Sequence, residues 1–428
     1  MIQALSLLVL VAVFVIATTT PVNMGVLAFV AAFLVGALSG MSLDDVLGSF
    51  PGDVFVLVVG ITLLFGVARV NGTIDLVVAA SLRLVRGRRW AIPWLMFALA
   101  AVLMSLGSVL AVGMLAPIAM PIAARYRINP LLMGMMLSHG ALSAAFSPIT
   151  VYGAFTSGMV ARSGLDVSPL VLFAVPFALN AGFAVVLFLV LGRDLLRRGD
   201  EQVSAVDEIE TAGGGGTATR TRTAVRTRVG VTPRRLLTLG GMLALLVVTG
   251  VFGVDPGVTA FVIGTAVLLV APHRHQDSMH EVAWSAVLLV CGMLTYMAVL
   301  KENGTLALLG EGAAALGSPL LAALLLCFAV AVLSAFGSSI GTLGIALPLA
   351  IPLLELGGIG AVGFVVALGF CSTVVDVSPF STNGIIVLAQ AQVPDRQWFQ
   401  RRMLAYGGLV VLVAPLLVWS AVVVPTSL

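Results

Sequence analysis

Charged residues are scarce in this 428-residue chain: 10% of the residues are Asp, Glu, Lys or Arg, whereas 60% are apolar. Soluble domains carry about 25% charged residues, so the composition excludes an ordinary soluble protein. The net charge of +3 is not gathered on one soluble face, and we expect no nucleic-acid partner. Most of the chain is expected to lie in a lipid bilayer.

Cysteine is scarce as well. Cys291, Cys327 and Cys371 lie in apolar runs and share no metal-ligand spacing, so we expect small buried side chains rather than disulfides or metal ligands. The apolar run 2–17 lacks a basic start and an A-x-A-like cleavage site. It is expected to be a first membrane helix and not a removable signal peptide.

Long apolar runs are abundant, and a membrane helix needs about 20 such residues. The candidate spans are 2–17, 24–40, 54–70, 131–160, 169–192, 236–252, 256–271, 282–299, 361–391 and 403–424. Two of them, 131–160 and 361–391, are too long for one straight span and are interrupted at Ser147-Pro148 and Ser378-Pro379. The pattern predicts an all-α polytopic membrane protein with about ten crossings and two discontinuous helices.

Two further segments, about 91–124 and about 319–354, consist of two apolar arms around a polar, glycine-containing tip. Each arm has about 14 residues and reaches about 21 Å, which is short of a hydrocarbon core of about 30 Å. We expect two re-entrant hairpins.

The chain resembles itself at a fixed spacing. At an offset of 231 residues, Ser147-Pro148 coincides with Ser378-Pro379, and at 232 residues Asn71-Gly72-Thr73 coincides with Asn303-Gly304-Thr305. Richness in glycine and alanine raises the number of chance matches, but a register held over this length predicts a duplication. The first repeat would span 1–198 and the second 236–428, with 199–235 between them.

Basic residues predict the orientation in the membrane. All 22 lysines and arginines except Arg162 and Lys301 would lie on the cytoplasmic side of a bacterial-type cytoplasmic membrane. Five crossings in each half invert the second half, so the first hairpin would open to the cytoplasm and the second outward. The segment 199–235, with four consecutive glycines, is expected to be a flexible, basic cytoplasmic linker.

Interrupted helices at membrane depth survive only inside protein or beside a water-filled cavity, and a pair of them is typical of the solute site of a secondary transporter. Helix N-termini behind the hairpin tips would attract an anion without a buried arginine. The candidate substrate-binding residues are Gly107, Ser108, Ser338, Ser339, Thr150, Ser381, Thr382 and Asn383. The alternative is that these small residues only allow close helix packing.

The two proline-interrupted segments also supply candidate ligands for a coupling cation, Na⁺ or H⁺. Carbonyl groups freed at Ser147-Pro148 and Ser378-Pro379 would suit Na⁺, whereas a simple proline kink is the alternative. Asp376 is a carboxylate at mid-membrane and is predicted to ligate a cation or carry a proton, rather than to be a structural acid. His139 either titrates near neutral pH or is a packing residue.

The segments Gly107-Ser108-Val109 with Pro117, Ser338-Ser339-Ile340 with Pro348, and Asp376–Gly384 (DVSPFSTNG) carry a family resemblance. The chain resembles the ion transporter superfamily, in particular the divalent-anion/sodium symporters and the MatC-type dicarboxylate (malonate) carriers. The resemblance implies a homodimeric elevator transporter that takes a small dicarboxylate, such as malonate or succinate, inward with Na⁺. Where the symporters carry Ser-Asn-Thr at both tips, this chain reads Gly-Ser-Val and Ser-Ser-Ile.

Two kinds of alternative stay open. A proton-coupled antiporter or an inorganic-oxyanion transporter of the same superfamily would use Asp376 and His139 for protons. An intramembrane hydrolase would pair Ser338 or Ser339 with His139, and it would need these side chains within hydrogen-bond reach. We expect a transporter without an enzyme's active site or a bound cofactor.

Overall fold

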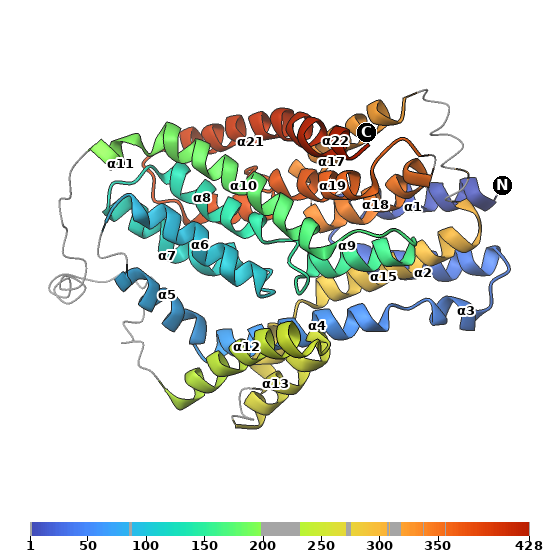
Figure 1. The fold of residues 1–428 in the computed structure, drawn as a ribbon, viewed down its shortest axis with the longest axis horizontal. Helices are drawn as coiled ribbons and strands as arrows, with labels where there is room; N and C mark the ends of the chain where they lie inside the picture. Colours follow the sequence, from blue (N-terminus) through green and yellow to red (C-terminus); the bar gives the residue numbers. More distant parts are fainter. Residues whose placement is uncertain are drawn as a thin grey trace.

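The chain was analysed as a computed structural model that describes residues 2–84, 88–197, 232–270, 275–305, 308, 318–336, 338–355 and 357–427. These residues form helices and no strand, which confirms the predicted all-α class (Figure 1). Of the predicted linker, residues 199–231 lie outside the described part of the chain, as does Gly337 at the second hairpin tip.

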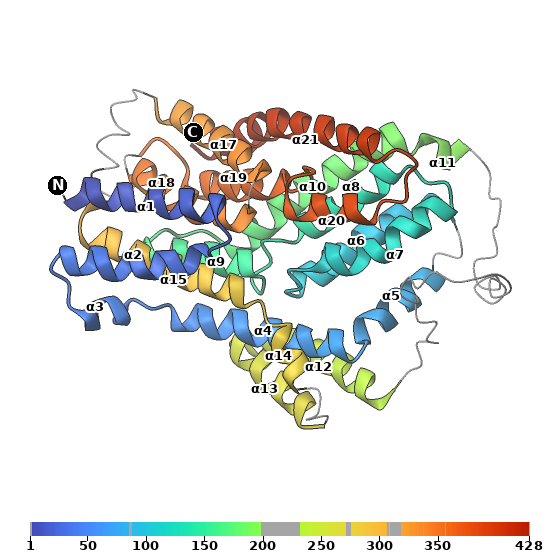
Figure 2. The ribbon, with the colours of Figure 1, turned by 180° about the vertical axis from the view of Figure 1, so that it is seen from behind.

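One group of helices, here called the frame, comes from the beginning of each predicted repeat. It consists of α1 (Ile2–Thr19), α2 (Met24–Leu38), α3 (Leu43–Gly48), α4 (Gly52–Val70), α5 (Thr73–Leu84), α12 (Pro233–Phe252), α13 (Pro256–Val270), α14 (His275–His280) and α15 (Trp284–Glu302). Helices α4, α12, α13 and α14 lie together along one edge of the molecule in both views (Figures 1 and 2).

The second group, here called the core bundle, contains both predicted hairpins and both interrupted helices. Its first part consists of α6 (Ala91–Ser105), α7 (Ala111–Arg125), α8 (Pro130–Ser143), α9 (Val151–Arg162), α10 (Pro169–Leu191) and α11 (Arg193–Arg197). Its second part consists of α17 (Pro319–Ala335), α18 (Ser339–Glu355), α19 (Ala361–Val374), α20 (Thr382–Gln390), α21 (Arg396–Val418), the π-helical turn η2 (Trp419–Val423) and α22 (Val424–Ser427). Helices α8 and α19 are largely buried in it, and α10 and α21 pack against them.

Polar caps and prolines set where several of these helices begin. The side chains of Asn129 and Ser318 accept hydrogen bonds from backbone N–H groups in the first turns of α8 and α17. Pro130 and Pro319 follow them at the first helical position, where a missing N–H costs nothing. The start of the first interrupted helix and the start of the second hairpin are therefore fixed by local sequence.

Four helices are long and apolar enough to cross a membrane by length and composition: α4, α10, α15 and the continuous run Arg396–Ser427. Several further apolar helices have 10–17 residues, among them the arms of both predicted hairpins. Arms α6 and α7 have 15 residues each, and α17 and α18 have 17 each. The count of about ten crossings and the re-entrant character of the hairpins stay predictions.

Within the frame, helices from the two halves of the chain cross at backbone contact. A methyl group on Gly25 of α2 would lie 2.0 Å from the carbonyl oxygen of Leu288 in α15, and one on Gly292 would lie 2.2 Å from that of Gly25. At the crossing of α4 and α13, a methyl group on Gly60 would lie 2.4 Å from the carbonyl oxygen of Gly257. Gly257 follows Gly25 by 232 residues, and Gly292 follows Gly60 by the same number. The same crossing therefore occurs twice at equivalent sequence positions.

A hydrogen-bond pattern also recurs at this offset. The side-chain nitrogen of Asn71 donates to the hydroxyl of Thr238 over 2.6 Å, and that of Asn303 donates to the hydroxyl of Ser6 over 3.0 Å. Asn303 is the repeat counterpart of Asn71, and Thr238 is the repeat counterpart of Ser6, each 232 residues later in the sequence. Each asparagine therefore ties its own half of the frame to the first helix of the other half.

Candidate functional site

The first interrupted helix ends at Ser143, and α9 begins at Val151 after a short non-helical segment. Thr150 caps α9, because its hydroxyl accepts the N–H of Gly153 at 3.0 Å while donating to the carbonyl oxygen of Ser147 at 2.8 Å. A methyl group on Gly153 would lie 2.0 Å from that same carbonyl oxygen. The helix is thus broken at the place that Ser147-Pro148 predicted.

The second interrupted helix repeats this arrangement. Helix α19 ends at Val374 and α20 begins at Thr382, and the hydroxyl of Ser381 donates to the carbonyl oxygen of Ser378 over 2.7 Å. A methyl group on Gly384 would lie 1.7 Å from that oxygen. Thr150 and Ser381 are 231 residues apart, as are Ser147 and Ser378.

The hairpin tips are bound to these broken segments. At the first tip, the carbonyl oxygen of Ser105 accepts a hydrogen bond of 2.7 Å from the hydroxyl of Ser147. Gly107 follows with φ of 104°, a left-handed conformation in which a methyl group would also lie 2.2 Å from the side chain of Ile61. At the second tip, the hydroxyl of Ser334 donates to the carbonyl oxygen of Ser372 at the end of α19.

A cavity of about 420 Å³ lies between the core bundle and the frame. On the core-bundle side it is lined by tip residues and by parts of both interrupted helices: Gly107, Ser108, Ser338, Tyr152, Asp376, Thr382 and Asn383. On the frame side α4 and the start of α15 line it, with the segment between α14 and α15. Six of the predicted site residues therefore share one cavity.

The other predicted site residues lie behind this lining. Ser147, Ser378, Thr150 and Ser381 are buried and their hydrogen bonds support the first tip and the helix starts. Ser339 is buried at the first residue of α18. Pro379 is buried as well, whereas Pro148 is exposed. None of these seven residues lines the cavity. Their roles in binding substrate or cation stay predictions.

Asp376 is the carboxylate that lines the cavity from within the broken segment, and its residue is 4% exposed. One of its side-chain oxygens accepts a hydrogen bond of 3.2 Å from the backbone N–H of Asn383. The carboxylate is thereby tied to the first turn of α20, where the helix dipole favours negative charge. Within the described part of the chain, no group of three or more His, Cys, Asp or Glu residues could hold a metal ion.

The frame contributes residues that the sequence did not single out. Arg69 of α4 forms an ion pair with Glu281, which precedes α15, and both line the cavity. Thr62 and Phe65 of α4 line it too, and Tyr152 completes the core-bundle wall. Arg69 and Glu281 are 212 residues apart, so no local motif joins them.

Two family models match the sequence, one in each half. Residues 1–145 match the N-terminal region of the dicarboxylate carrier protein MatC, and residues 252–426 match a citrate transporter family. The resemblance to the ion transporter superfamily is confirmed. With it, the prediction of a multi-pass membrane transporter rather than an enzyme is also confirmed.

Solved transporters of low sequence identity share the fold. MtrF of Neisseria gonorrhoeae, which represents a class of antimetabolite efflux pumps, is 14% identical with a TM-score of 0.55, over 90% of this chain and 83% of MtrF. The YdaH transporter of Alcanivorax borkumensis is 19% identical with a TM-score of 0.52, over 88% of this chain and 86% of YdaH. No curated protein matches the sequence.

His139 does not form the base of a hydrolytic site in this transporter. Its Nδ1 lies 2.8 Å from the side-chain oxygen of Asn180 and its Nε2 lies 2.6 Å from the hydroxyl of Tyr406, and the ring stacks on Phe183. The residue is fully buried between α8, α10 and α21 and does not line the cavity. The arrangement matches the packing interpretation of His139.

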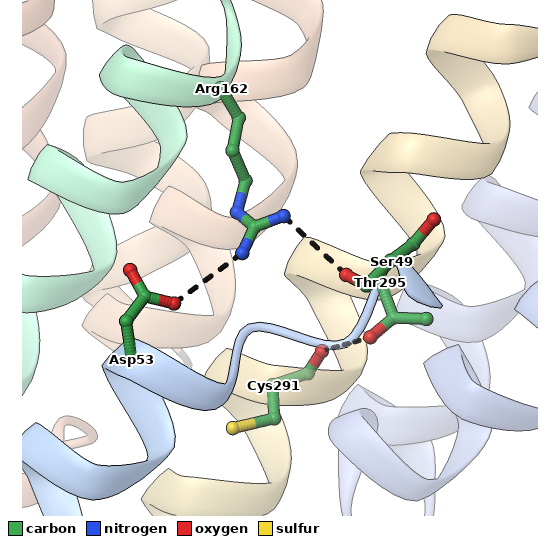
Figure 3. A network of polar contacts seen from close by, with 5 residues as sticks. All are labelled: Ser49, Asp53, Arg162, Cys291 and Thr295. Atoms are coloured by element: carbon green, nitrogen blue, oxygen red, sulfur yellow. Dashed lines mark hydrogen bonds and ion pairs between the residues drawn. The ribbon is translucent and has the colours of Figure 1, made fainter. Parts of the chain in front are cut away.

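A second cavity, of about 950 Å³, lies where α3, α9 and α15 end. Figure 3 shows the polar contacts of Arg162, one of its lining residues. A nitrogen of Arg162 lies 3.6 Å from a carboxylate oxygen of Asp53, and another donates to the carbonyl oxygen of Ser49 over 3.5 Å. Lys301 donates to the carbonyl oxygen of Arg162 over 2.7 Å. Arg162 and Lys301, the two basic residues predicted to lie on the outer side, thus connect the core bundle with the frame at this place.

One acid that lines this second cavity is held in its charged form. The hydroxyl of Ser42 and its backbone N–H donate to the Asp45 carboxyl and keep the pKa of that group below its usual range. With Asp44 and Glu302, Asp45 gives the cavity more acidic than basic side chains. An anion would be repelled here, so this cavity is a poor candidate for the substrate site of an anion carrier.

Proposed function

We propose that this transporter carries a small organic anion, a dicarboxylate of the malonate or succinate class, across the cytoplasmic membrane. The observation that carries the proposal is the 420 Å³ cavity, which is lined by both hairpin tips and by the start of α20. The names of the two matching families, a dicarboxylate carrier and a citrate transporter, support a carboxylate as the cargo.

Binding would rest on hydroxyls and backbone N–H groups rather than on a buried cation. Ser338 precedes α18, so the positive end of that helix lies at the cavity. At the start of α20 the N–H of Asn383 is already bonded to Asp376, so the side chains of Thr382 and Asn383 are the groups that α20 offers to the cargo. A carboxylate at such a helix start gains charge-assisted hydrogen bonds. Arg69, at the frame wall, has its charge balanced by Glu281.

An elevator-type movement is part of this proposal. It is supported by the division into a frame and a core bundle with both hairpins, and by the contacts that recur at offsets of 231 and 232 residues. On this proposal the two halves are inverted repeats with about ten crossings in total. Two copies of the chain would associate through their frames, with the segment 199–235 in the cytoplasm.

The coupling ion is proposed to be Na⁺, and one observation favours H⁺ instead. The carbonyl oxygen of Ser147 accepts hydrogen bonds from the N–H and the hydroxyl of Thr150. The carbonyl oxygen of Ser378 likewise accepts hydrogen bonds from the N–H and the hydroxyl of Ser381. These bonds engage the carbonyl groups of Ser147 and Ser378, which are two of the predicted Na⁺ ligands. Asp376 is then the group that lines the cavity from the core bundle and can carry a proton.

Uptake into proteoliposomes tests the cargo and the coupling together. Labelled malonate, succinate, citrate and sulfate would be offered under an imposed Na⁺ gradient or an imposed pH gradient. We expect gradient-driven accumulation of a dicarboxylate and none of sulfate. Accumulation of sulfate alone would replace the proposal with the inorganic-oxyanion alternative.

Asp376→Asn tests the role of this residue in proton coupling. With proton coupling, the neutral side chain should reduce pH-driven uptake at least tenfold while leaving exchange of labelled for unlabelled substrate intact. Asp166→Asn, in an exposed loop, is the matched control. Unchanged pH-driven uptake by Asp376→Asn would remove this residue from the coupling mechanism.

A further inference from the structure

A third cavity, of about 690 Å³, lies between the junction of α4 and α5 and the start of α12. Its polar side is lined by Arg69, Arg234, Arg235, Asn71 and Thr232. Its other walls are apolar and belong to α4, α12 and α13: Val67, Val70, Leu237, Val267, Leu268 and Val270. Leu237 and Val270 are 45% and 54% exposed, so the apolar side opens at the surface.

The charges in this cavity favour a ligand with one negative charge. Arg69 is paired with Glu281. Among the described residues that line the cavity, Arg234 and Arg235 are the other basic residues and Asp75 is the one acidic residue. Arg234 is exposed, and no ion pair to it is found among the described residues. Two arginines against one aspartate leave a charge of +1, which matches a single phosphodiester.

The other half of the frame makes the corresponding contact without an arginine. Arg235 donates through Nε to the carbonyl oxygen of Asn71 over 3.0 Å, at the turn between α4 and α5. At the equivalent place in the other half of the frame, 232 residues earlier, the neutral Gln3 donates to the carbonyl oxygen of Gly304 over 3.3 Å. The residue at the position equivalent to Arg234 in that half is Ile2. An amide therefore makes the equivalent bond to the turn in the other half of the frame.

We propose that this cavity binds the phosphate headgroup of an anionic phospholipid. Arginine guanidinium groups bind phosphate oxygens in a bidentate manner, and the apolar walls would take the upper part of an acyl chain. Basic pockets between membrane helices bind anionic headgroups in this way. The competing explanation is that Arg234 and Arg235 serve only to orient the chain in the membrane.

The test compares lipid binding by the full-length transporter and by Arg234→Gln/Arg235→Gln. This pair removes both charges, and the glutamine at 235 can make the bond that Gln3 makes in the other half. The matched control is Arg401→Gln/Arg402→Gln, which removes two adjacent exposed arginines from α21. Retained phosphatidylglycerol would be measured by native mass spectrometry, and thermal unfolding would be followed in phosphatidylcholine micelles with added phosphatidylglycerol.

We expect the double variant Arg234→Gln/Arg235→Gln, here called the cavity variant, to bind phosphatidylglycerol about 25-fold more weakly. A basic residue near an anionic lipid contributes about 1 kcal/mol, which corresponds to about fivefold in affinity for each arginine removed. Arg234→Gln alone should weaken binding about fivefold and keeps the Arg235 bond in place. The control pair should bind as the unchanged protein does.

Three results would overturn the proposal. They are equal binding by the unchanged protein and the cavity variant, an equal loss in the control pair, and stabilisation by glycerol 3-phosphate that matches that by phosphatidylglycerol. The second result would leave the arginines with a role in orientation only. The third would assign the cavity to a soluble phosphate compound.

Discussion

Asn383 is the residue through which the acid and the helix start are joined. Its backbone N–H bonds to Asp376, while the residue itself lines the cavity at the first turn of α20. Its repeat counterpart, 231 residues earlier, is Tyr152, which lines the same cavity. The two halves therefore offer an amide and a phenol at equivalent positions, and the binding site is not symmetric.

Removing the Asn383 amide should weaken substrate binding. Asn383→Ala retains the backbone N–H to Asp376, so the turn should persist while one hydrogen bond to a charged group, worth about 1.5–3 kcal/mol, is lost. The KM for the transported dicarboxylate should rise at least tenfold. Thr249→Ala is the control, because its hydroxyl bonds within α12. An unchanged KM would place the substrate elsewhere.

At the scale of elements, sequence reasoning located the interruptions well. Serine-proline pairs at Ser147 and Ser378 break a helix through local chemistry. The hydroxyl of Thr150 then caps the helix that follows the first pair. The frame wall of the cavity could not be found in this way. Arg69 and Glu281 meet only because α4 packs beside the segment that leads into α15.

Helix crossings in the frame depend on glycine. Gly25→Ala places a methyl group 2.0 Å from the carbonyl oxygen of Leu288, so α2 and α15 must separate. Such overpacking costs about 1–3 kcal/mol, and thermal unfolding in detergent should occur at a lower temperature. Gly240→Ala in α12 has open space around it and should be neutral or stabilising, because alanine favours helix. Equal unfolding temperatures for the two variants would contradict close crossing.

For the molecule as a whole, the frame is shared between the halves. Helix α2 packs on α15 and α4 on α13, so each half covers glycine faces of the other. The offsets in the sequence predicted a duplication, but they could not show that the equivalent helices exchange partners. That arrangement depends on packing between segments more than 180 residues apart.

The shared frame predicts how separated halves behave. Residues 1–198 and 232–428, produced together as two chains, should assemble and support uptake, because the contacts between them do not require a peptide bond. A tagged first half should then retain the untagged second half during purification in detergent. Either half produced alone should aggregate. A stable, monodisperse single half would contradict the exchange of partners.

The close approach of Gly25 to Leu288 has a consequence for how the protein is made. A ribosome that adds about 5–20 residues per second takes roughly 13–50 s to pass from the first of these residues to the second. During that interval α2 resides in the bilayer before its partner helix exists. Nascent chains halted before residue 288 should therefore be the preferred targets of membrane proteases and insertion chaperones.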